Sequence, residues 1–368
     1  MSQDDAPVRL RAALADVPPY SPGRPPRPRT GAPTYKISSN ENPYPPLPAV
    51  LDVVARSARQ LNRYPDLGSS ELSAAIAGHL DVPVEHVVPG TGSVGVLGQI
   101  VTATCSVGDE VVHAWRSFEA YPIVVRLSGA RAVPVPLTAE GRHDLPAMAD
   151  AVTERTRLVL VCSPNNPTGP VVHADELVAL LDRVPRDVVV VIDEAYTEFV
   201  RDPQAADALA LHRARRNVVV LRTFSTAYGL AGLRVGYAVA HPAVAEALRK
   251  TAVPFGVSTI AQDAAVASLT AGAELAARVQ ALVTERDRIA VGLREQGWRL
   301  PETQANFVWF PVAEQTAALT AAFEDAGLSV RPYGVEGVRA TIGERAAGDR
   351  LLEVAGAFWQ HVLGQAGG

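Results

Sequence analysis

Two reactive side chains, those of cysteine and lysine, are scarce in this sequence. The two cysteines, Cys105 and Cys162, lie far apart, each within an apolar stretch. This spacing supports neither a disulfide framework nor a thiolate metal site, and we expect both to pack as small hydrophobic residues. Of the 34 basic residues, only Lys36 and Lys250 are lysines. Chemistry that requires a side-chain amine therefore has two candidates.

Long apolar runs and clustered charge are also missing. No segment approaches the roughly 20 apolar residues that span a bilayer, and the first residues include no apolar run typical of a signal peptide. The formal charge of −5 comes from 34 basic and 39 acidic residues mixed along the chain, which leaves no basic stripe for a nucleic-acid backbone. We therefore expect a cytoplasmic protein that binds neither membranes nor nucleic acids.

The chain does contain enough apolar material for a large core, since 48% of its 368 residues are hydrophobic and 20% are charged. The first forty residues are rich in proline, which predicts an extended arm. Beyond them, short β-branched runs alternate with helical patterns. Such runs, without in/out alternation, are typical of strands buried on both faces of a mainly parallel sheet, and they predict an α/β fold. The clearest runs are 111–112, 158–161, 188–192 and 218–221.

The pattern changes after Pro254. Residues 259–297 predict a long, mostly uninterrupted helix, and a further helix is expected over 314–326. Strand-like segments at 306–310, 328–331 and 338–342 complete a smaller α+β unit. We therefore predict an arm over 1–38, a large ligand-binding domain over 39–257 and a small domain over 258–368.

A glycine-rich motif, GTGSVG at 90–95, follows a short apolar stretch and precedes a helical one. It satisfies the pattern GxGxxG, which by itself is weak evidence for a nicotinamide dinucleotide. Small residues at a helix N-terminus let the backbone approach an anion, because free N–H groups and the helix dipole favour phosphate. We interpret the motif as a phosphate site, with a structural turn as the alternative.

Three further polar loops come directly after predicted strands: SPNNPTG at 163–169, DEAY at 193–196 and TFSTAYGLAGLRVGY at 223–237. Open α/β sheets place ligands at this end of their strands. Asp193 emerges from a buried strand, where a carboxylate is costly unless it is paired, so its partner should be a ligand or an arginine. Hydroxyl groups and Arg234 in the third loop could hold an anion. A turn or helix cap could explain one such loop, but hardly all of them.

Taken together and in this order, these motifs resemble the fold-type I pyridoxal-phosphate aminotransferases. The similarity is greatest to the branch of histidinol-phosphate and aromatic amino acid aminotransferases. It covers nearly the whole chain, with further matches at 39–44, 62–66, 304–307 and 338–339. The resemblance implies a large domain with a mainly parallel sheet, a smaller domain, and pyridoxal 5′-phosphate as the cofactor.

The resemblance also implies a role for individual residues. Asp193 would face the pyridine nitrogen of the cofactor, Asn166 and Tyr196 would bind its phenolic oxygen, and Phe118 would stack on the ring. The residues expected at the phosphate are Ser93, Val94, Thr223, Ser225 and Arg234.

Other matched positions point to the substrate and to a partner subunit. Arg339 resembles the arginine that binds the substrate carboxylate, and Asn40, Asn306 and Arg331 would line the substrate end. Tyr64 resembles the residue that reaches a partner subunit's phosphate group, which implies a homodimer with composite active sites.

The sequence departs from the family at the centre of its third motif. Thr226 stands where the family has the lysine that forms the Schiff base and then moves the proton. A hydroxyl cannot form an imine and is a poor base at neutral pH. Neither Lys36 nor Lys250 lies at a motif position. The explanations are a deliberate substitution that traps an aldimine, a natural homologue without transamination, and altered chemistry in which Tyr228, Tyr196 or water moves the proton. We favour the first, since the other cofactor positions are intact.

The predicted parent activity is a transaminase of aromatic amino acids, phenylalanine foremost, with a 2-oxo acid as acceptor. Histidinol phosphate is the alternative substrate, and Arg331 would then bind its phosphate group. A non-catalytic pyridoxal-phosphate-binding protein and a nicotinamide enzyme are alternatives of other classes. For this chain we expect non-covalent cofactor binding, or an external aldimine, with severely impaired turnover.

Overall fold

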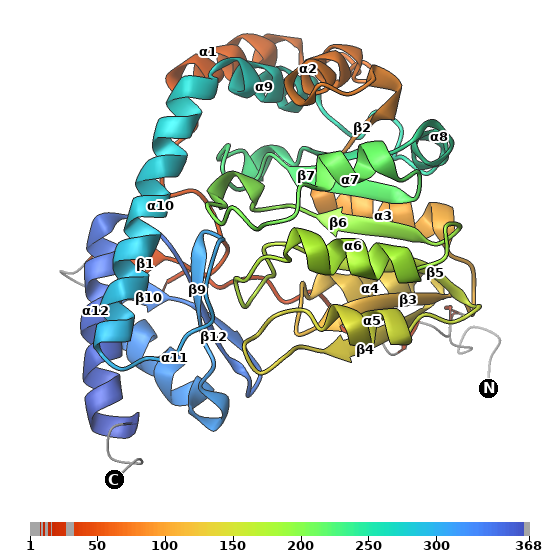
Figure 1. Ribbon diagram of the computed structural model, residues 1–368. Coiled ribbons are helices and arrows are strands. Elements are labelled where there is room, and N and C mark those ends of the chain that lie inside the picture. Colours follow the sequence, from red (N-terminus) through yellow and green to blue (C-terminus); the bar gives the residue numbers. More distant parts are fainter. Residues whose placement is uncertain (1–7, 9, 12–13, 16, 27–32, 364–368) are drawn as a thin grey trace, which may run out of the picture.

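The structure is a computed structural model that describes residues 8, 10–11, 14–15, 17–26 and 33–363, and it confirms the predicted α/β fold (Figure 1). A seven-stranded sheet has the order β2-β8-β7-β6-β5-β3-β4, in which only β8 runs antiparallel to its neighbours. The strands are β2 (Val87–Gly90), β3 (Glu110–Trp115), β4 (Arg131–Pro136), β5 (Thr156–Cys162), β6 (Val189–Asp193), β7 (Val218–Thr223) and β8 (Gly236–Val239).

The central strands lie where their continuous apolar runs predict them. Successive residues of β6 and β7 are buried on both faces of the sheet, as Val190 and Val191 illustrate. The edge strand β4 differs, because Pro134 and Pro136 cannot donate to a central ladder and its side chains are partly exposed. Cys105 and Cys162 are buried free thiols, as expected.

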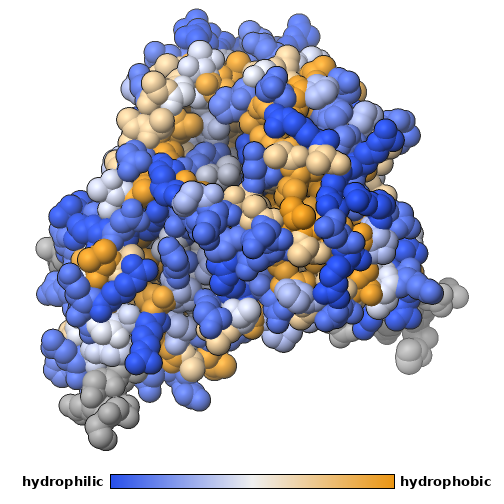
Figure 2. Space-filling view, viewed as in Figure 1, coloured by the Kyte–Doolittle hydropathy of each residue, from blue (hydrophilic) through white to orange (hydrophobic). Residues whose placement is uncertain are grey.

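Helices cover both faces of this sheet. One layer consists of α3 (Gly92–Thr104), α4 (Ala120–Ser128) and α8 (Pro242–Lys250), and the other of α5 (Leu145–Asp150), α6 (Ala174–Arg183) and α7 (Ala208–Ala214). Figure 1 shows the second layer in front of the sheet. The same face is mostly hydrophilic in the space-filling view, with hydrophobic residues scattered between (Figure 2), so this layer turns its polar side to solvent.

A second group of elements packs beside the sheet (Figure 1). A three-stranded antiparallel sheet has the order β11-β12-β9, and β1 pairs with β10 in parallel. These elements are β1 (Tyr35–Lys36), β9 (Phe307–Phe310), β10 (Leu328–Ser329), β11 (Arg331–Tyr333), β12 (Gly337–Thr341), α11 (Thr316–Asp325) and α12 (Arg345–Phe358). The predicted domain limits at 38 and 257 stay a prediction.

The helix predicted over 259–297 is interrupted, so that expectation is wrong in part. The chain forms α9 (Thr259–Thr270) and α10 (Gly272–Glu295), with Ala271 between them at ψ 32°, outside the helical region. The following Gly272 is a weak helix former, which makes a break there cheap. The break lets α9 pack on α1 (Pro48–Ser57) and α2 (Ser70–Leu80), whereas α10 reaches α12.

No helix among the described residues has the length and apolar character needed to cross a membrane. This finding agrees with the lack of long apolar runs in the sequence.

Candidate active site

The polar loops that follow the parallel strands meet at one edge of the sheet and surround a cavity of about 300 Å³. The small sheet and residues of the arm, among them Tyr20 and Pro22, close its other side. Thirteen of the fifteen residues predicted from the sequence line this cavity: Asn40, Ser93, Val94, Phe118, Asn166, Asp193, Tyr196, Thr223, Ser225, Thr226, Arg234, Arg331 and Arg339. The structure therefore brings together side chains from positions 40 to 339 of the chain.

Asp193, the last residue of β6, is a buried carboxylate that is only half satisfied. Its Oδ2 accepts a hydrogen bond from the Tyr121 hydroxyl at 2.8 Å, but Oδ1 has no partner among the described residues. Burial raises the pKa of Asp193 to about 6, because the charged form loses its hydration. The next residue, Glu194, does have an arginine partner, since Arg222 donates to it at 2.7 and 2.8 Å. Asp193 therefore offers an open oxygen to a donor inside the cavity.

One end of the cavity has the features of an anion site. Helix α3 begins at Gly92 without a side-chain cap on its N–H groups, and Ser93 and Val94 line the cavity. Arg234 lies against this turn and donates to the Ser225 hydroxyl at 3.3 Å. Gly92 has φ +78°, and a Cβ there would lie 2.5 Å from the Arg234 guanidinium. Glycine is thus required for the close approach of this cation to the helix N-terminus, where a phosphate group fits.

The opposite end holds a hydrogen-bonded group around Arg339. Its guanidinium donates to Asn166 Oδ1 at 2.6 Å, to the Tyr333 hydroxyl at 3.0 Å and to the Ser38 carbonyl at 2.8 Å. Its Nε is buried and has no partner among the described residues. A buried arginine with an unused donor is suited to a carboxylate ligand.

Three other predicted residues have different surroundings. Asn306 lies behind the cavity and donates to the Asn40 carbonyl at 3.2 Å, so it supports the lining without being part of it. Arg331 forms a short ion pair with Glu119. Tyr64 is 82% exposed and packs on Phe255, outside the cavity of its own chain.

Sequence reasoning missed the support that Tyr121 gives to Asp193 and the place of Tyr333 beside Arg339. Both positions could have been predicted from their spacing in the sequence. Tyr121 follows Phe118 by three residues, close to a helical turn, and Tyr333 follows Arg331 by two, which places both on the same side of a strand. The pairing of Arg331 with Glu119 could not be predicted in this way, because the two residues are distant in sequence.

Thr226 lines the cavity and is almost fully buried. Its hydroxyl donates to the Ala195 carbonyl at 2.7 Å. The two lysines lie elsewhere: Lys36 pairs with Glu41 at 2.8 Å, and Lys250 pairs with Glu246 at 2.7 Å. Neither lysine lines the cavity.

The fold, the half-satisfied carboxylate and the anion site together define a pyridoxal-phosphate protein. The chain belongs to the family of aminotransferases of class I and II, whose sequence model matches residues 33–354. Pyridoxal 5′-phosphate is therefore its cofactor, and the open oxygen of Asp193 and the anion site at α3 fit the two ends of that molecule.

Two curated relatives are named aromatic amino acid aminotransferase. The one from Streptomyces avermitilis is 60% identical over 95% of this chain and 97% of its own length. The one from Streptomyces coelicolor is 58% identical over the same shares of both chains. Among solved structures, the histidinol-phosphate aminotransferase from Sinorhizobium meliloti, in complex with pyridoxal 5′-phosphate, is similar with a TM-score of 0.85 and 28% identity. That similarity covers 96% of this chain and 100% of the other.

The raised pKa of Asp193 makes a prediction for the cofactor-free protein. Because folding raises this pKa from 3.8 to about 6, the ionised carboxylate destabilises the fold, and stability is lost as the pH rises from about 4 to about 6. The variant Asp193→Asn removes this effect. At pH 8 we expect its free energy of unfolding to exceed that of the parent by about 3 kcal/mol, in denaturant titrations without cofactor.

The difference between variant and parent should shrink towards pH 4, because Asp193 is then protonated in the folded state and only about half ionised in the unfolded state. Asp52→Asn, on the exposed side of α1, is the matched control and should show no such dependence. A stability difference for Asp193→Asn that is the same at pH 4 and pH 8 would contradict this account.

Proposed function

We propose that this chain has the scaffold of an aromatic amino acid aminotransferase and that Thr226 occupies the position of its lysine. It would then hold pyridoxal phosphate without a covalent bond and turn over poorly. One observation supports this most directly. The cavity has a carboxylate, an anion site and a buried arginine, yet neither of the two lysines of the chain lines it.

The cofactor, when bound, supplies an aldehyde that accepts an amino group and a ring that withdraws electrons. In our proposal Asp193 holds a proton on the pyridine nitrogen through its open Oδ1. Tyr196 accepts from Asn40 at 2.9 Å, which leaves its own hydroxyl proton for the ring oxygen. Asn166 accepts from Arg339 with Oδ1 and would donate to the same ring oxygen with Nδ2. Phe118 would pack on the ring face.

The phosphate group would be held by the N–H groups of Ser93 and Val94, the hydroxyls of Thr223 and Ser225, and the Arg234 guanidinium. Arg339 would bind the substrate carboxylate, for which its unused Nε is available. Asn40, supported by Asn306, orients Tyr196 at the same end.

The cavity has no primary amine among its lining residues. The Thr226 hydroxyl cannot form the covalent bond to the cofactor aldehyde, and it is a poor base for moving the substrate proton. Tyrosines are weak replacements: burial raises the pKa values of Tyr196 and Tyr228 well above their usual range, and Tyr228 does not line the cavity. These observations favour impaired turnover over altered chemistry, whether the substitution is natural or deliberate. A non-catalytic pyridoxal-phosphate-binding protein stays the alternative.

Aromatic substrates are favoured over histidinol phosphate by the surroundings of Arg331. Its guanidinium pairs with Glu119. This carboxylate neutralises the positive charge of Arg331, which would otherwise be available to bind the phosphate group of histidinol phosphate. The two Streptomyces relatives bear the name of the aromatic enzyme. Histidinol phosphate stays the second candidate substrate, since the similar solved structure from Sinorhizobium meliloti is named a histidinol-phosphate aminotransferase.

The variant Thr226→Lys should restore transamination, because it returns an amine of the right length to the cavity. We expect borohydride to fix the cofactor to residue 226 in this variant, seen as added mass on the peptide that contains it. In the parent chain, the cofactor should leave on unfolding and gel filtration even after borohydride treatment.

Thr226→Arg is the matched control, since it introduces a cation of similar length that forms no imine with the cofactor. Cofactor fixed to Lys36 or Lys250 in the parent chain would contradict the proposal. Thr226→Lys protein that binds the cofactor normally but shows no transamination would favour the non-catalytic alternative.

Substrate choice can be tested in the Thr226→Lys background by removing the charge that neutralises Arg331. We expect phenylalanine to be used in preference to histidinol phosphate. The added substitution Glu119→Gln should raise kcat/KM for histidinol phosphate about tenfold, with little change for phenylalanine, because the freed guanidinium can bind a phosphate group.

Glu336→Gln is the control, since this carboxylate pairs with Arg116 beside the cavity and not with Arg331. A preference for histidinol phosphate before any change at Glu119 would overturn the aromatic assignment.

We also propose a homodimer in which Tyr64 reaches the phosphate group bound by the partner subunit. Its 82% exposure in the single chain supports this, since an exposed tyrosine at a motif position has no role in its own cavity. Sedimentation should show a dimer, and Tyr64→Phe should weaken cofactor binding about tenfold through loss of one hydrogen bond to a charged group. Tyr44→Phe, at another exposed tyrosine, should not. A monomer with full cofactor affinity would refute the composite site.

A further inference from the structure

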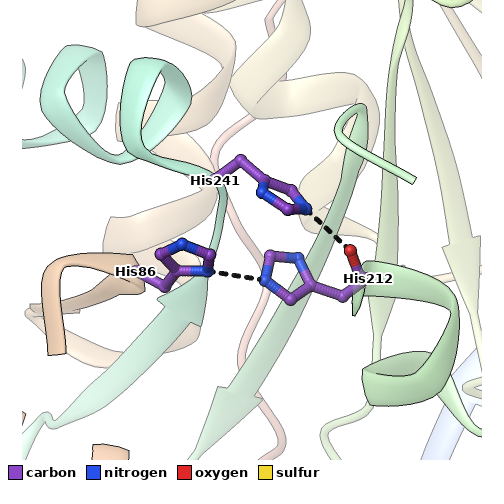
Figure 3. A group of neighbouring side chains, drawn as sticks. All are labelled: His86, His212 and His241. Atoms are coloured by element: carbon purple, nitrogen blue, oxygen red, sulfur yellow. Dashed lines mark hydrogen bonds between the residues drawn. The ribbon is translucent and has the colours of Figure 1, made fainter. Parts of the chain in front are cut away.

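Three histidines from separate parts of the chain meet at the other end of the sheet (Figure 3). His86 directly precedes β2, His212 lies in α7 just before β7, and His241 follows β8 and precedes α8. Because β2 and β7 begin where the antiparallel β8 ends, all three reach the same edge of the sheet. The cofactor cavity lies at the opposite edge, where β6 and β7 end.

The side-chain nitrogens of this His86–His212–His241 cluster have a spacing close to that of metal ligands. One nitrogen from each histidine lies within 4.8 Å of the others, and His86 Nδ1 is 3.0 Å from His212 Nε2. A tetrahedral zinc ion with bonds of 2.0–2.1 Å holds its ligand nitrogens roughly 3.4 Å apart. A small side-chain rotation would therefore bring all three within reach of one ion.

The hydrogen bonds of the cluster direct lone pairs into it. His212 Nδ1 is 2.9 Å from the Val218 carbonyl, which can only accept, so Nδ1 carries the proton and Nε2 presents its lone pair to His86. Metal-ligating histidines are commonly oriented by such a bond from the other ring nitrogen. His241 Nε2 donates in the same way to the His212 carbonyl at 2.7 Å, which leaves its Nδ1 unprotonated in the neutral ring.

Exposure and charge around the cluster are compatible with an ion. His212 is 1% exposed, whereas His86 and His241 are half-buried, so an ion can enter from solvent and keep a water ligand. The guanidinium of Arg213, the neighbour of His212, is held by hydrogen bonds that it donates to the carbonyls of Leu80 and Asp81.

From this geometry we propose that His86, His212 and His241 bind a divalent cation of the zinc class. Imidazole ligands suit Zn²⁺, and Co²⁺ serves as its spectroscopic substitute. The ion would replace the proton shared between His86 and His212. It would connect the start of β2, the end of α7 and the junction of β8 with α8, and so stabilise this edge of the sheet without contact with the cofactor.

The test uses the full-length chain without an affinity tag, loaded with pyridoxal phosphate and freed of metal by a chelator. Calorimetric titration with Zn²⁺ should show one equivalent per chain, with a dissociation constant in the micromolar range or below. A hundredfold excess over that constant should raise the melting temperature by roughly 3 °C or more. Bound Co²⁺ should give the intense visible absorption of a tetrahedral site.

The variants His86→Gln and His241→Gln should each weaken Zn²⁺ binding at least tenfold, because each removes one of three ligands. Both residues are half-buried, so the variants should fold, which circular dichroism without metal can confirm. His361→Gln, at an exposed histidine outside the cluster, is the matched control.

Zinc binding that is equal in the parent and in folded His86→Gln and His241→Gln protein, or no binding by the parent, would overturn the proposal. Cofactor uptake by the parent, followed in the same samples, should not depend on Zn²⁺. The metal site and the proposed function can therefore fail independently.

Discussion

The site depends on one buried carboxylate. Asp193 ends a strand that is apolar on both faces, and no arginine or lysine among the described residues forms an ion pair with it. The Tyr121 hydroxyl donates to one of its oxygens, and the other has no hydrogen-bond partner among the described residues. Burial of this charge destabilises the cofactor-free fold, and in our proposal a protonated ring nitrogen of the cofactor is the missing partner. Cofactor binding and stability would then be coupled through the same atom.

Around that carboxylate, the two ends of the cavity are organised by different means. The anion end is built mainly from backbone, because a helix N-terminus and a glycine turn let N–H groups and Arg234 approach a phosphate. The substrate end is built from side chains that bind one another, with Arg339, Asn166 and Tyr333 in one network. A cavity with both ends intact and Thr226 in its lining is the basis of our proposal that this protein binds the cofactor but turns over poorly.

The two sheet edges have different chemistry for a topological reason. Parallel strands bring the loops after β5, β6 and β7 to one edge, where the cofactor cavity forms. The antiparallel β8 returns the chain to the other edge, where His241 meets His86 and His212. Polar side chains cluster at both edges because the strands between them are closed to solvent by helices on both faces.

The sequence by itself determined the strands β5, β6 and β7, the anion loop at 90–95 and most of the cavity lining, because these depend on local apolar runs, glycine spacing and motif order. It also indicated that Asp193 needs a partner, but not that the Tyr121 hydroxyl would bind one of its oxygens. Only the tertiary structure decided that contact, the pairing of Arg331 with Glu119, the break at Ala271 and the meeting of the three histidines. Apart from the weak helix propensity of Gly272, each of these depends on the packing of segments distant in sequence, which no local pattern records.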